Sequence, residues 1–523
     1  MNTPSVTVSR CTNCPLNRRN FLRRGGVVAA GALGVLAAPR WLGAAEPAGK
    51  TRIRILYALH AAEQPGPDWP NKGFDFKPVM ERIHSTLTRE CAGFEFIPSL
   101  ATGKEQAKKI LDEDQAAGNI DGYLVYQMNA WNQVVQTMAT SGKPVLYADF
   151  QFGGSGGFLV YTAAFLRGRV PNVGFVASSD INDLVRAVQC FQIVKQGGSV
   201  AEFVAATAQA RRKATPQPGN PVPKKDDLKC LTADECLKRL KTSRILVVRD
   251  QSAGAEAAVA GIAVERIPFA ALNEAWAAAD KDESRAVADR WQQEARKVEG
   301  VNRETLEASA AMYLGMKKLL KDHDASGITV NCLGGFYGNH IHAYPCLGFH
   351  QLNNEGLVGG CEGDVRSATT MLIGTTLTQG RPGYISDPVI DTSKRQIIYA
   401  HCVAPNKVFG PQGESNPFEI LTHSEDRQGA SVRSILPTGY LTTTLEFNQD
   451  RKEVLFHRAH AVANDPDDRA CRTKLCGEPV GDIEKLFAEW DAWGWHRVTF
   501  YGDLKEPVHA LADALGWKVV EEA

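Results

Sequence analysis

Short apolar runs alternate with amphipathic stretches along the first third of the chain. The runs RIRILYAL (52–59), DGYLVYQM (121–128) and KPVLYAD (143–149) are typical of buried strands, whereas KPVMERIHSTLTREC (77–91) has the spacing of a helix. Strands that alternate with helices form parallel sheets, because each connection must cross over the sheet. The pattern therefore predicts a Rossmann-like, doubly wound α/β domain over residues 50–172.

A second series of strands and helices follows and is interrupted once. It begins at NVGFVASSD (172–180) and ends with the strand GITVNCL (327–333), which predicts a second α/β domain over residues 173–355. The segment 206–227 is rich in Ala, Pro, Lys and Arg and has no aromatic residue, so we expect an exposed insertion there. A basic binding patch is the alternative interpretation of the same residues.

The pattern changes after about residue 375, where β-rich runs dominate. In GYLTTTLEFNQDRKEVLFHRAHAV (439–462), two such runs flank the polar turn NQDRK, which predicts a hairpin. A strand HRVTFYG (496–502) and a helix EPVHALADALG (506–516) follow. We therefore predict a C-terminal α+β domain over residues 356–523 with a β-rich, barrel-like part. Three domains are also what a chain of 523 residues is expected to form.

The first 45 residues carry six arginines and no acidic residue. The segment NRRNFLRR (17–24) precedes a twelve-residue apolar run (27–38) and small residues before a predicted cleavage after Ala45. This arrangement resembles a twin-arginine export signal, which implies a periplasmic or extracellular protein. An uncleaved membrane anchor is the alternative, but twelve apolar residues are too short to cross a hydrocarbon core of about 30 Å. We expect no membrane span in the mature chain.

The composition excludes one class of partner. Apolar residues make up 44% of the chain and charged residues 23%, which is ordinary for a globular protein. The formal net charge is zero, but without the arginine-rich first 45 residues 53 basic and 59 acidic side chains remain, a net charge of −6. A mildly acidic body has no electrostatic attraction for nucleic acid, so we expect no nucleic-acid partner.

Two acidic residues stand out in the C-terminal domain. In CEGDVRSATTMLI (361–373), Glu362 follows an apolar, Gly-rich run, where a bare buried carboxylate is costly. Asp364 heads the following helix and is expected to be its N-cap. Asp387 ends the run RPGYISD, 25 residues after Glu362. If the two strands were adjacent and joined by a crossover helix, both carboxylates would lie at one sheet edge, and such a pair needs a cation or a shared proton.

These residues carry a resemblance to a known family. The segments GCEGDVRSATTMLIGTTLTQGRPGYISD (360–387) and WGWHRVTFYGDLKEPVHALADALGWKV (493–519) resemble the L-fucose isomerase family and, more loosely, L-arabinose isomerases. The resemblance implies that Glu362, Asp387 and His496 bind a divalent metal and that the two carboxylates are the acid/base pair. Two carboxylates and one imidazole suit Mn²⁺, with Mg²⁺ or Co²⁺ as alternatives.

The implied reaction is aldose–ketose isomerisation of a monosaccharide through an ene-diol. The resemblance also implies a homo-oligomer. Since the family's known members act inside the cell, the export signal is a departure from its pattern. A non-catalytic periplasmic sugar-binding protein is the alternative function, because such proteins are also built from two successive Rossmann-like domains.

Three further residues are candidates for substrate binding. Tyr337 lies in GGFYG, a substrate-side turn in the family; His401 ends the strand RQIIYAHC; and Trp131 follows a first-domain strand and could stack on a sugar. Two of them have a structural alternative, namely a hydrogen-bonded structural imidazole for His401 and burial for Trp131.

Overall fold

The computed structural model describes residues 49–249 and 253–523. The chain divides into two units, Met1–Gly49 and Lys50–Ala523, and the second contains every helix and strand described below. The expected export signal over residues 1–45 lies outside the described residues, so it stays a prediction. Among the residues that the structure describes, no helix combines the length and the apolar character needed to cross a membrane.

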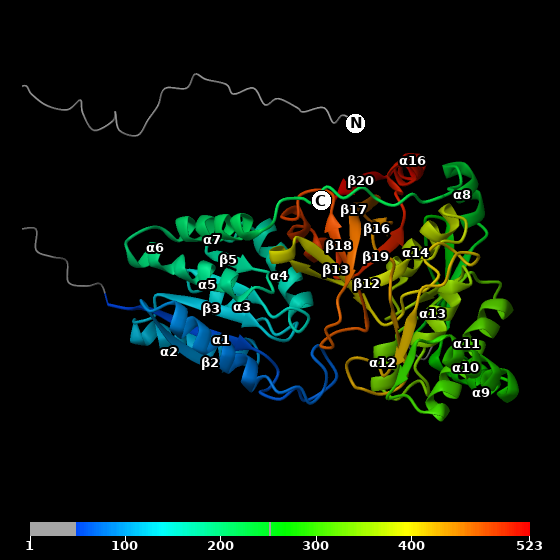
Figure 1. Cartoon of the computed structure of the whole chain (residues 1–523), viewed down its shortest axis with the longest axis horizontal. Coiled ribbons are helices and arrows are strands. Elements are labelled where there is room, and N and C mark those ends of the chain that lie inside the picture. The colour runs from blue at the N-terminus through cyan, green and yellow to red at the C-terminus, as the bar shows by residue number, and fades with distance from the viewer. Residues whose placement is uncertain (1–48, 250–252) are drawn as a thin grey trace, which may run out of the picture. The chain divides into compact units, whose positions relative to one another are not determined.

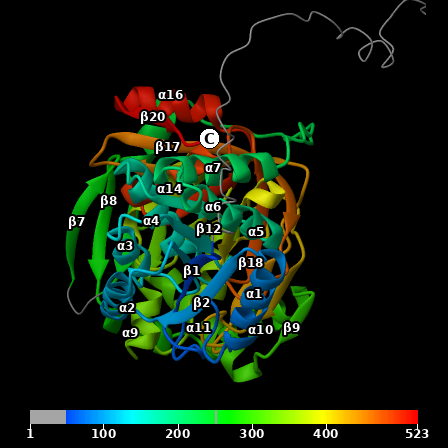
Figure 2. The ribbon, with the colours of Figure 1, turned by 90° about the vertical axis from the view of Figure 1, so that its left-hand side faces the viewer.

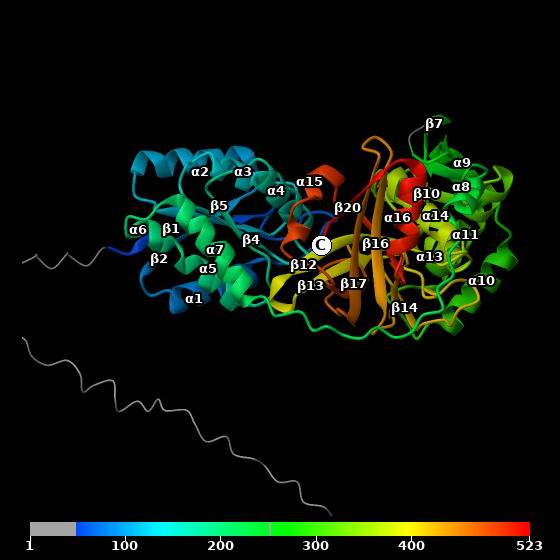
Figure 3. The ribbon, with the colours of Figure 1, turned by 90° about the horizontal axis from the view of Figure 1, so that it is seen from above.

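The first sheet has five parallel strands in the order β2-β1-β3-β4-β5 (Figure 1). Its strands are β1 (Thr51–Ala58), β2 (Phe94–Ala101), β3 (Gly122–Gln127), β4 (Val145–Asp149) and β5 (Val173–Val176). Helices cover both faces, with α2, α3 and α4 on one side and α1, α5 and α7 on the other (Figure 3). They are α1 (Lys77–Glu90), α2 (Lys104–Ala117), α3 (Val134–Ala139), α4 (Ser155–Arg167), α5 (Ile181–Gln189) and α7 (Val200–Ala214), with α6 (Phe191–Lys195) between the last two. The predicted α/β class with a parallel sheet is confirmed.

The structure corrects two details of the predicted domain map. Strand β5 pairs with β4, so it belongs to the first sheet and not to the second series of strands. Helix α7 occupies residues 206–214 of the expected insertion, because a capping box starts it at Ser199 and its Ala- and Arg-rich sequence favours a helix. Its Arg211 is buried and forms a 2.6 Å ion pair with Glu484. Residues 216–227 have no helix or strand and are mostly exposed.

The second sheet has the order β11-β10-β6-β8-β7. Only β7 runs antiparallel to its neighbour, β8, and this pair is seen at the left of Figure 2. Its strands are β6 (Arg244–Val248), β7 (Gly254–Val259), β8 (Ile262–Ile267), β10 (Gly327–Val330) and β11 (Val358–Gly360). The helices of this region are α8 (Ala233–Leu240), α9 (Phe269–Ala277), α10 (Lys281–Glu294), α11 (Arg303–Asp322), α12 (Cys332–Tyr337) and α13 (Cys346–Asn354). The short strand β11 is an edge strand, and the chain leaves the second sheet at its end.

Six antiparallel strands of the C-terminal region close into a barrel. Their order is β16-β19-β12-β13-β18-β17, and β17 pairs back onto β16. The strands are β12 (Tyr384–Asp391), β13 (Gln396–His401), β16 (Leu441–Asn448), β17 (Glu453–Asn464), β18 (Thr473–Pro479) and β19 (Arg497–Tyr501). The predicted hairpin is the β16–β17 pair, and the predicted barrel-like part is confirmed.

The remaining elements surround the barrel. Strand β20 (Lys518–Glu521) pairs with β17, and β14 (Phe418–Leu421), β15 (Ser431–Ser434) and β9 (Lys297–Glu299) form a small separate sheet. The helices are α14 (Val365–Leu377), α15 (Trp490–Trp493) and α16 (Lys505–Leu515), with 3₁₀ turns at η1 (Thr392–Lys394) and η2 (Lys485–Phe487). Helix α14 connects the edge of the second sheet to the barrel.

A buried ionic network holds the start of β19 in place. Arg497 is fully buried and pairs with Glu522 at 2.7 Å, and Glu522 also lies 2.8 Å from His457 Nδ1. Burial would raise the pKa of Glu522, but Arg497 and His457 lower it to about 2. The network therefore fixes the backbone next to His496, which immediately precedes Arg497.

Candidate active site

Glu362 is presented by a strained turn at the end of β11. Its φ is 63°, in the left-handed region that residues with a side chain seldom adopt, and Gly363 follows with φ 64°. The Gly363 N–H donates to the Val330 carbonyl at 2.8 Å, which ties the turn to the end of β10. Such backbone strain persists only where the surroundings impose it, and it is frequent at functional sites.

Asp387 reaches the same place by a different route from the one that the sequence predicted. Strands β11 and β12 are not neighbours, since β11 belongs to the second sheet and β12 to the barrel. Asp387 also lies within β12 and not at its end. Helix α14 nevertheless carries the chain from one sheet to the other, so that the two carboxylates meet across the junction.

The barrel register explains how two histidines join the carboxylates. Asp387 pairs with Ala400 on β13, and His401 is the next residue. On the other side of β12, Ser386 pairs with Arg497 on β19, and His496 immediately precedes that residue. Neighbouring strands therefore deliver both imidazoles beside Asp387.

The three predicted metal ligands and His401 converge. One donor atom from each of Glu362, Asp387, His401 and His496 lies within 4.8 Å of the other three. His496 Nε2 is 3.2 Å from Glu362 Oε2 and 3.1 Å from Asp387 Oδ1, whereas His401 Nε2 is 3.9 Å from each carboxylate. Two ligands on opposite sides of one cation are separated by about 4–4.6 Å, twice a ligand distance of about 2.0–2.3 Å, so the spacing fits a single ion.

Hydrogen bonding leaves key atoms of this cluster free. Among the described residues, Asp387 Oδ1 and His401 Nε2 are buried and have no hydrogen-bond partner. Although Asp387 Oδ1 is only 3.1 Å from His496 Nε2, this contact lacks hydrogen-bond geometry. Buried polar atoms are normally satisfied, so these orphans are consistent with a cation or a substrate oxygen as the missing partner.

His496 and His401 are held in different ways. His496 Nδ1 is 2.9 Å from Asp364 Oδ2, which leaves Nε2 facing Glu362 and Asp387. A carboxylate behind a ligating imidazole is the usual arrangement at metal sites. In contrast, His401 Nδ1 accepts from the Cys402 N–H at 2.9 Å, so a neutral His401 carries its proton on Nε2. His496 is therefore suited to bind a metal, and His401 to donate a hydrogen bond.

The charges of the cluster favour a cation. Burial opposes protonation of His496, but Glu362, Asp364 and Asp387 raise its pKa well above the ordinary value. Burial would raise the pKa of Glu362, but His496 lowers it. The carboxylates thus favour the protonated, positively charged form of His496. A divalent ion would supply that charge in its place, and the donor set of two carboxylates and one imidazole fits Mn²⁺, Mg²⁺ or Co²⁺.

Asp364 has two functions at once. It is the N-cap of α14, since its side chain accepts from the Ser367 N–H at 3.1 Å, and the predicted cap is thereby confirmed. Its second oxygen accepts from Ser367 Oγ and faces His496. The contact with His496 was missed, because nothing in the local sequence connects residues 132 positions apart.

A cavity of about 480 Å³ opens onto the cluster and is large enough for a monosaccharide. Two of the predicted substrate-binding residues line this cavity. They are Trp131, which is 53% exposed, and Tyr337, which is 41% exposed. His401 is buried and not part of this lining, although its Nε2 faces the two carboxylates.

Four aromatic or acidic residues of the lining are not among the predicted site residues. Trp495 packs edge-on against Trp69 at 5.3 Å and against Trp131 at 6.2 Å, which makes an aromatic wall. Asp68 and Glu425 add carboxyl groups, and burial raises the pKa of each to about 7. Of these four residues, only Trp495 is adjacent in sequence to a predicted metal ligand, His496. That adjacency could have indicated that Trp495 lies at the site.

No protein-family model matches the chain. The chain is similar to sulfoquinovose isomerases. It is 26% identical to that of Priestia aryabhattai over 229 residues, which cover 42% of this chain and 50% of that protein. It is also 26% identical to that of Clostridium sp. (strain MSTE9) over 237 residues, which cover 40% and 47%. The chain therefore spans about half the length of the curated relatives that it matches. These relatives agree with the sequence-based resemblance at the level of sugar isomerases, and the L-fucose isomerase family stays a prediction.

Two solved structures were also matched weakly. A regulatory protein of the LacI family from Chloroflexus aggregans has a TM-score of 0.16 and 11% identity, and the match covers 56% of this chain and 83% of that one. An ABC transporter solute-binding protein from Bacillus halodurans with bound myo-inositol has a TM-score of 0.17 and 13% identity, over 57% and 83%. Similarity at this level supports no structural argument.

Proposed function

We propose that the protein is a divalent-metal-dependent aldose–ketose isomerase that acts on an uncharged monosaccharide. The observation that carries the proposal is the convergence of Glu362, Asp387 and His496 beside a cavity of monosaccharide size. The similarity to sulfoquinovose isomerases supports the same class of reaction. Mn²⁺ is the proposed metal, with Mg²⁺ and Co²⁺ as alternatives.

The roles of the residues follow from their exposure. Glu362, whose side chain is 29% exposed beside the cavity, removes the proton from C2 of the aldose and delivers it to C1. Asp387, at 5%, assists proton movement between the two sugar oxygens. His401 donates its Nε2–H to a substrate oxygen near both carboxylates. Glu362, Asp387 and His496 would hold the cation, which would supply the charge that polarises the sugar carbonyl and offsets the negative charge of the ene-diolate.

The walls of the cavity argue for a substrate without an anionic group. Its described lining contains no Lys or Arg, but it contains the carboxyl groups of Asp68, Glu362, Asp387 and Glu425. A sulfonate, as in the sugar named for the curated relatives, would find no Lys or Arg in this lining and would lie among several carboxyl groups. Sugar hydroxyls can donate to the carboxyl groups, and the apolar faces of a sugar can pack on Trp69, Trp131 and Trp495.

The test is metal analysis followed by an assay for ketose formation. The protein is stripped with a chelator, reloaded with Mn²⁺, Mg²⁺ or Co²⁺, and given L-fucose, L-arabinose, other neutral aldoses and sulfoquinovose. One metal per chain and conversion of a neutral aldose are expected. Glu362→Gln should abolish turnover, whereas Glu414→Gln, an exposed acid elsewhere, should not. Sugar-dependent thermal stabilisation without turnover in any metal would instead favour a binding protein.

We also propose that the protein is exported by the twin-arginine route, on the basis of the sequence of residues 1–45 alone. Replacement of both Arg18 and Arg19 by lysine should retain the protein in the cytoplasm of an expressing bacterium. Equal recovery of the variant and the original from the periplasm would contradict the proposal.

A further inference from the structure

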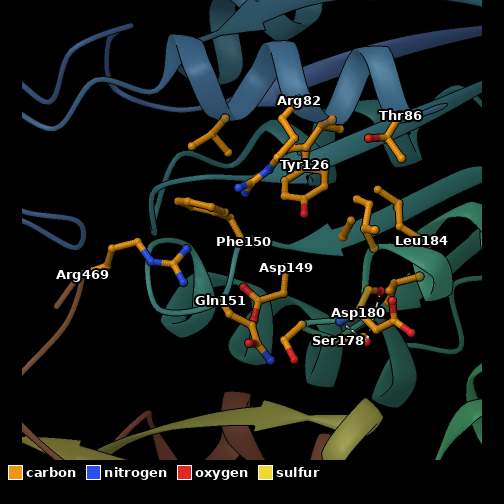
Figure 4. Close-up of a pocket in the computed structure, with 16 residues that line it drawn as sticks. Arg82, Thr86, Tyr126, Asp149, Phe150, Gln151, Ser178, Asp180, Leu184 and Arg469 are labelled. Atoms are coloured by element: carbon orange, nitrogen blue, oxygen red, sulfur yellow. Dashed lines mark hydrogen bonds between the residues drawn. The ribbon is translucent and has the colours of Figure 1, made fainter. Parts of the chain in front are cut away.

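A second cavity of about 430 Å³ lies at the first sheet, away from the carboxylate–histidine cluster (Figure 4). It is formed at the carboxyl ends of three adjacent strands, with Tyr126 from β3, Asp149 from β4 and Ser178 just after β5. In open α/β sheets this edge is where ligands bind. The volume lies within the range of small-molecule sites.

Asp149 is the most informative residue of this cavity. Its side chain is 4% exposed, and Oδ2 accepts from Ser155 Oγ at 2.8 Å. Oδ1 is buried and has no hydrogen-bond partner among the described residues. Burial raises the pKa of Asp149 to about 7, against the opposing effect of the Ser155 hydrogen bond. A buried acceptor without a donor is unusual, and a ligand hydroxyl would satisfy it.

The other charged groups around the cavity are nearly balanced. Arg82 extends from the exposed face of α1 toward the cavity and forms no ion pair with another described residue (Figure 4). Arg469 enters from the loop before β18, but Asp467 neutralises it at 2.6 Å. Asp180 also lines the cavity, and its carboxylate lies 3.9 Å from Arg186 Nη2. One free guanidinium therefore faces one buried carboxyl group, which gives no net attraction for an ionic ligand. The guanidinium can donate to an oxygen of a neutral ligand, and Asp149 can accept from a hydroxyl.

The second cavity shares a wall with the first. The turn from β4 to α4 places Phe150 and Gln151 at the second cavity and Gly153 at the first. Phe152, between them, has φ 71°, and a Cβ on Gly153 would come within 2.6 Å of the Met128 carbonyl oxygen. The turn is therefore tightly fixed and separates two distinct sites.

We propose that this second cavity binds one neutral, monosaccharide-sized polyol. A hydroxyl of the ligand donates to Asp149 Oδ1, Arg82 donates to a second oxygen, and the side chains of Tyr126 and Phe150 flank the ring or carbon chain. The proposal does not depend on the isomerase function, because none of these residues contributes to the carboxylate–histidine cluster.

The experiment is hydrogen–deuterium exchange together with calorimetric titration of the full chain. The probes are L-fucose, D-mannose and xylitol, with gluconate as an anionic comparison. A neutral probe is expected to protect peptides that cover residues 145–152 and 176–184. Arg82→Ala and the isosteric Asp149→Asn should each weaken this binding at least tenfold. Arg89→Ala is the matched control, because Arg89 is exposed on the same helix, pairs with Glu90 and does not line the cavity.

Three results would overturn the proposal. Protection could be confined to peptides around Glu362, the Arg82→Ala variant could bind neutral probes like the original protein, or gluconate could protect the 145–152 peptides in preference to every neutral probe. Because Arg82 is exposed, its removal does not endanger folding, so the test remains decisive even if Asp149→Asn is unstable. Aldose turnover is measured in Arg82→Ala as well. Unchanged kinetics in this variant would show that the outcome for the second cavity is independent of the outcome for the isomerase proposal.

Discussion

The two functions of Asp364 can be separated by one substitution. Asparagine is as good an N-cap as aspartate, so Asp364→Asn keeps an oxygen for the Ser367 N–H. The substitution replaces the second oxygen, which now lies 2.9 Å from His496 Nδ1, by an NH₂ group that cannot accept a hydrogen bond. His496 then favours the tautomer with its proton on Nε2, and the lone pair that faces Glu362 and Asp387 is lost.

The expected effect on metal affinity and the effect on stability can be measured separately. Loss of a carboxylate behind a ligating histidine weakens metal binding by about 10–100-fold, or about 1.4–2.7 kcal/mol. In the metal-free protein, Asp364→Asn keeps the cap but removes one of the carboxylates that hold a proton on His496, so the free energy of unfolding should fall by about 1–3 kcal/mol. Asp364→Ala should also lose the cap, at a cost of about 0.5–2 kcal/mol.

Titration with Mn²⁺ in a competing chelator, and urea denaturation of the metal-free protein, measure the two quantities. Asp280→Asn is the matched control, because Asp280 caps α10 in the same way and has no histidine partner. If Asp364→Asn bound Mn²⁺ with unchanged affinity, the assignment of His496 Nε2 as a metal ligand would be refuted.

Further predictions concern stability, acid sensitivity and substrate binding. Glu522→Gln should lower the free energy of unfolding by about 3–5 kcal/mol, because it leaves the buried Arg497 without its charge partner. The control Glu521→Gln, at a side chain that is 42% exposed, should change the free energy of unfolding by less than about 0.5 kcal/mol. Equal losses in the two variants would contradict the prediction. Since the pKa of Glu522 is lowered to about 2, its contribution to stability is present above its ordinary value of 4.5 and is lost as pH falls from there toward 2; Glu522→Gln should flatten this part of a stability–pH profile. Trp131→Ala should raise KM for the sugar by about two- to tenfold, as expected for one lost aromatic contact, with little change in thermal stability because the side chain is 53% exposed. An unchanged KM would remove Trp131 from the substrate wall.

Local pattern was sufficient for much of the architecture. The alternation of strands and helices before residue 172 predicted the parallel first sheet, and the polar turn NQDRK predicted the β16–β17 hairpin. The start of the expected insertion was wrong, because the capping box at Ser199 and the buried pair of Arg211 extend α7 into it. Composition indicated exposure there, but a long-range ion pair decided the structure.

The sequence predicted which three side chains converge, but not which strands bring them together. Glu362, Asp387 and His496 converge, although the premise of two adjacent strands was wrong, since the carboxylates come from different sheets. His401 joins the cluster only because β13 pairs with β12 in a particular register. Register and barrel closure depend on pairings between distant segments, which periodicity within one segment does not encode. The same holds for Asp364 and His496, which are far apart in sequence.

The division of the proposed metal ligands between two sheets has a consequence for how the protein would respond to its surroundings. Glu362 belongs to the edge of the second sheet, and Asp387 and His496 belong to the barrel, so a bound cation would cross-link the two across helix α14. Any opening at this junction would release the ion, and mass action would oppose the opening. At a free metal concentration one hundred times the Kd, the ion would add about 2.7 kcal/mol to the free energy of unfolding. Heat resistance would then depend on the supply of metal, and a chelator would lower Tm without any sugar present.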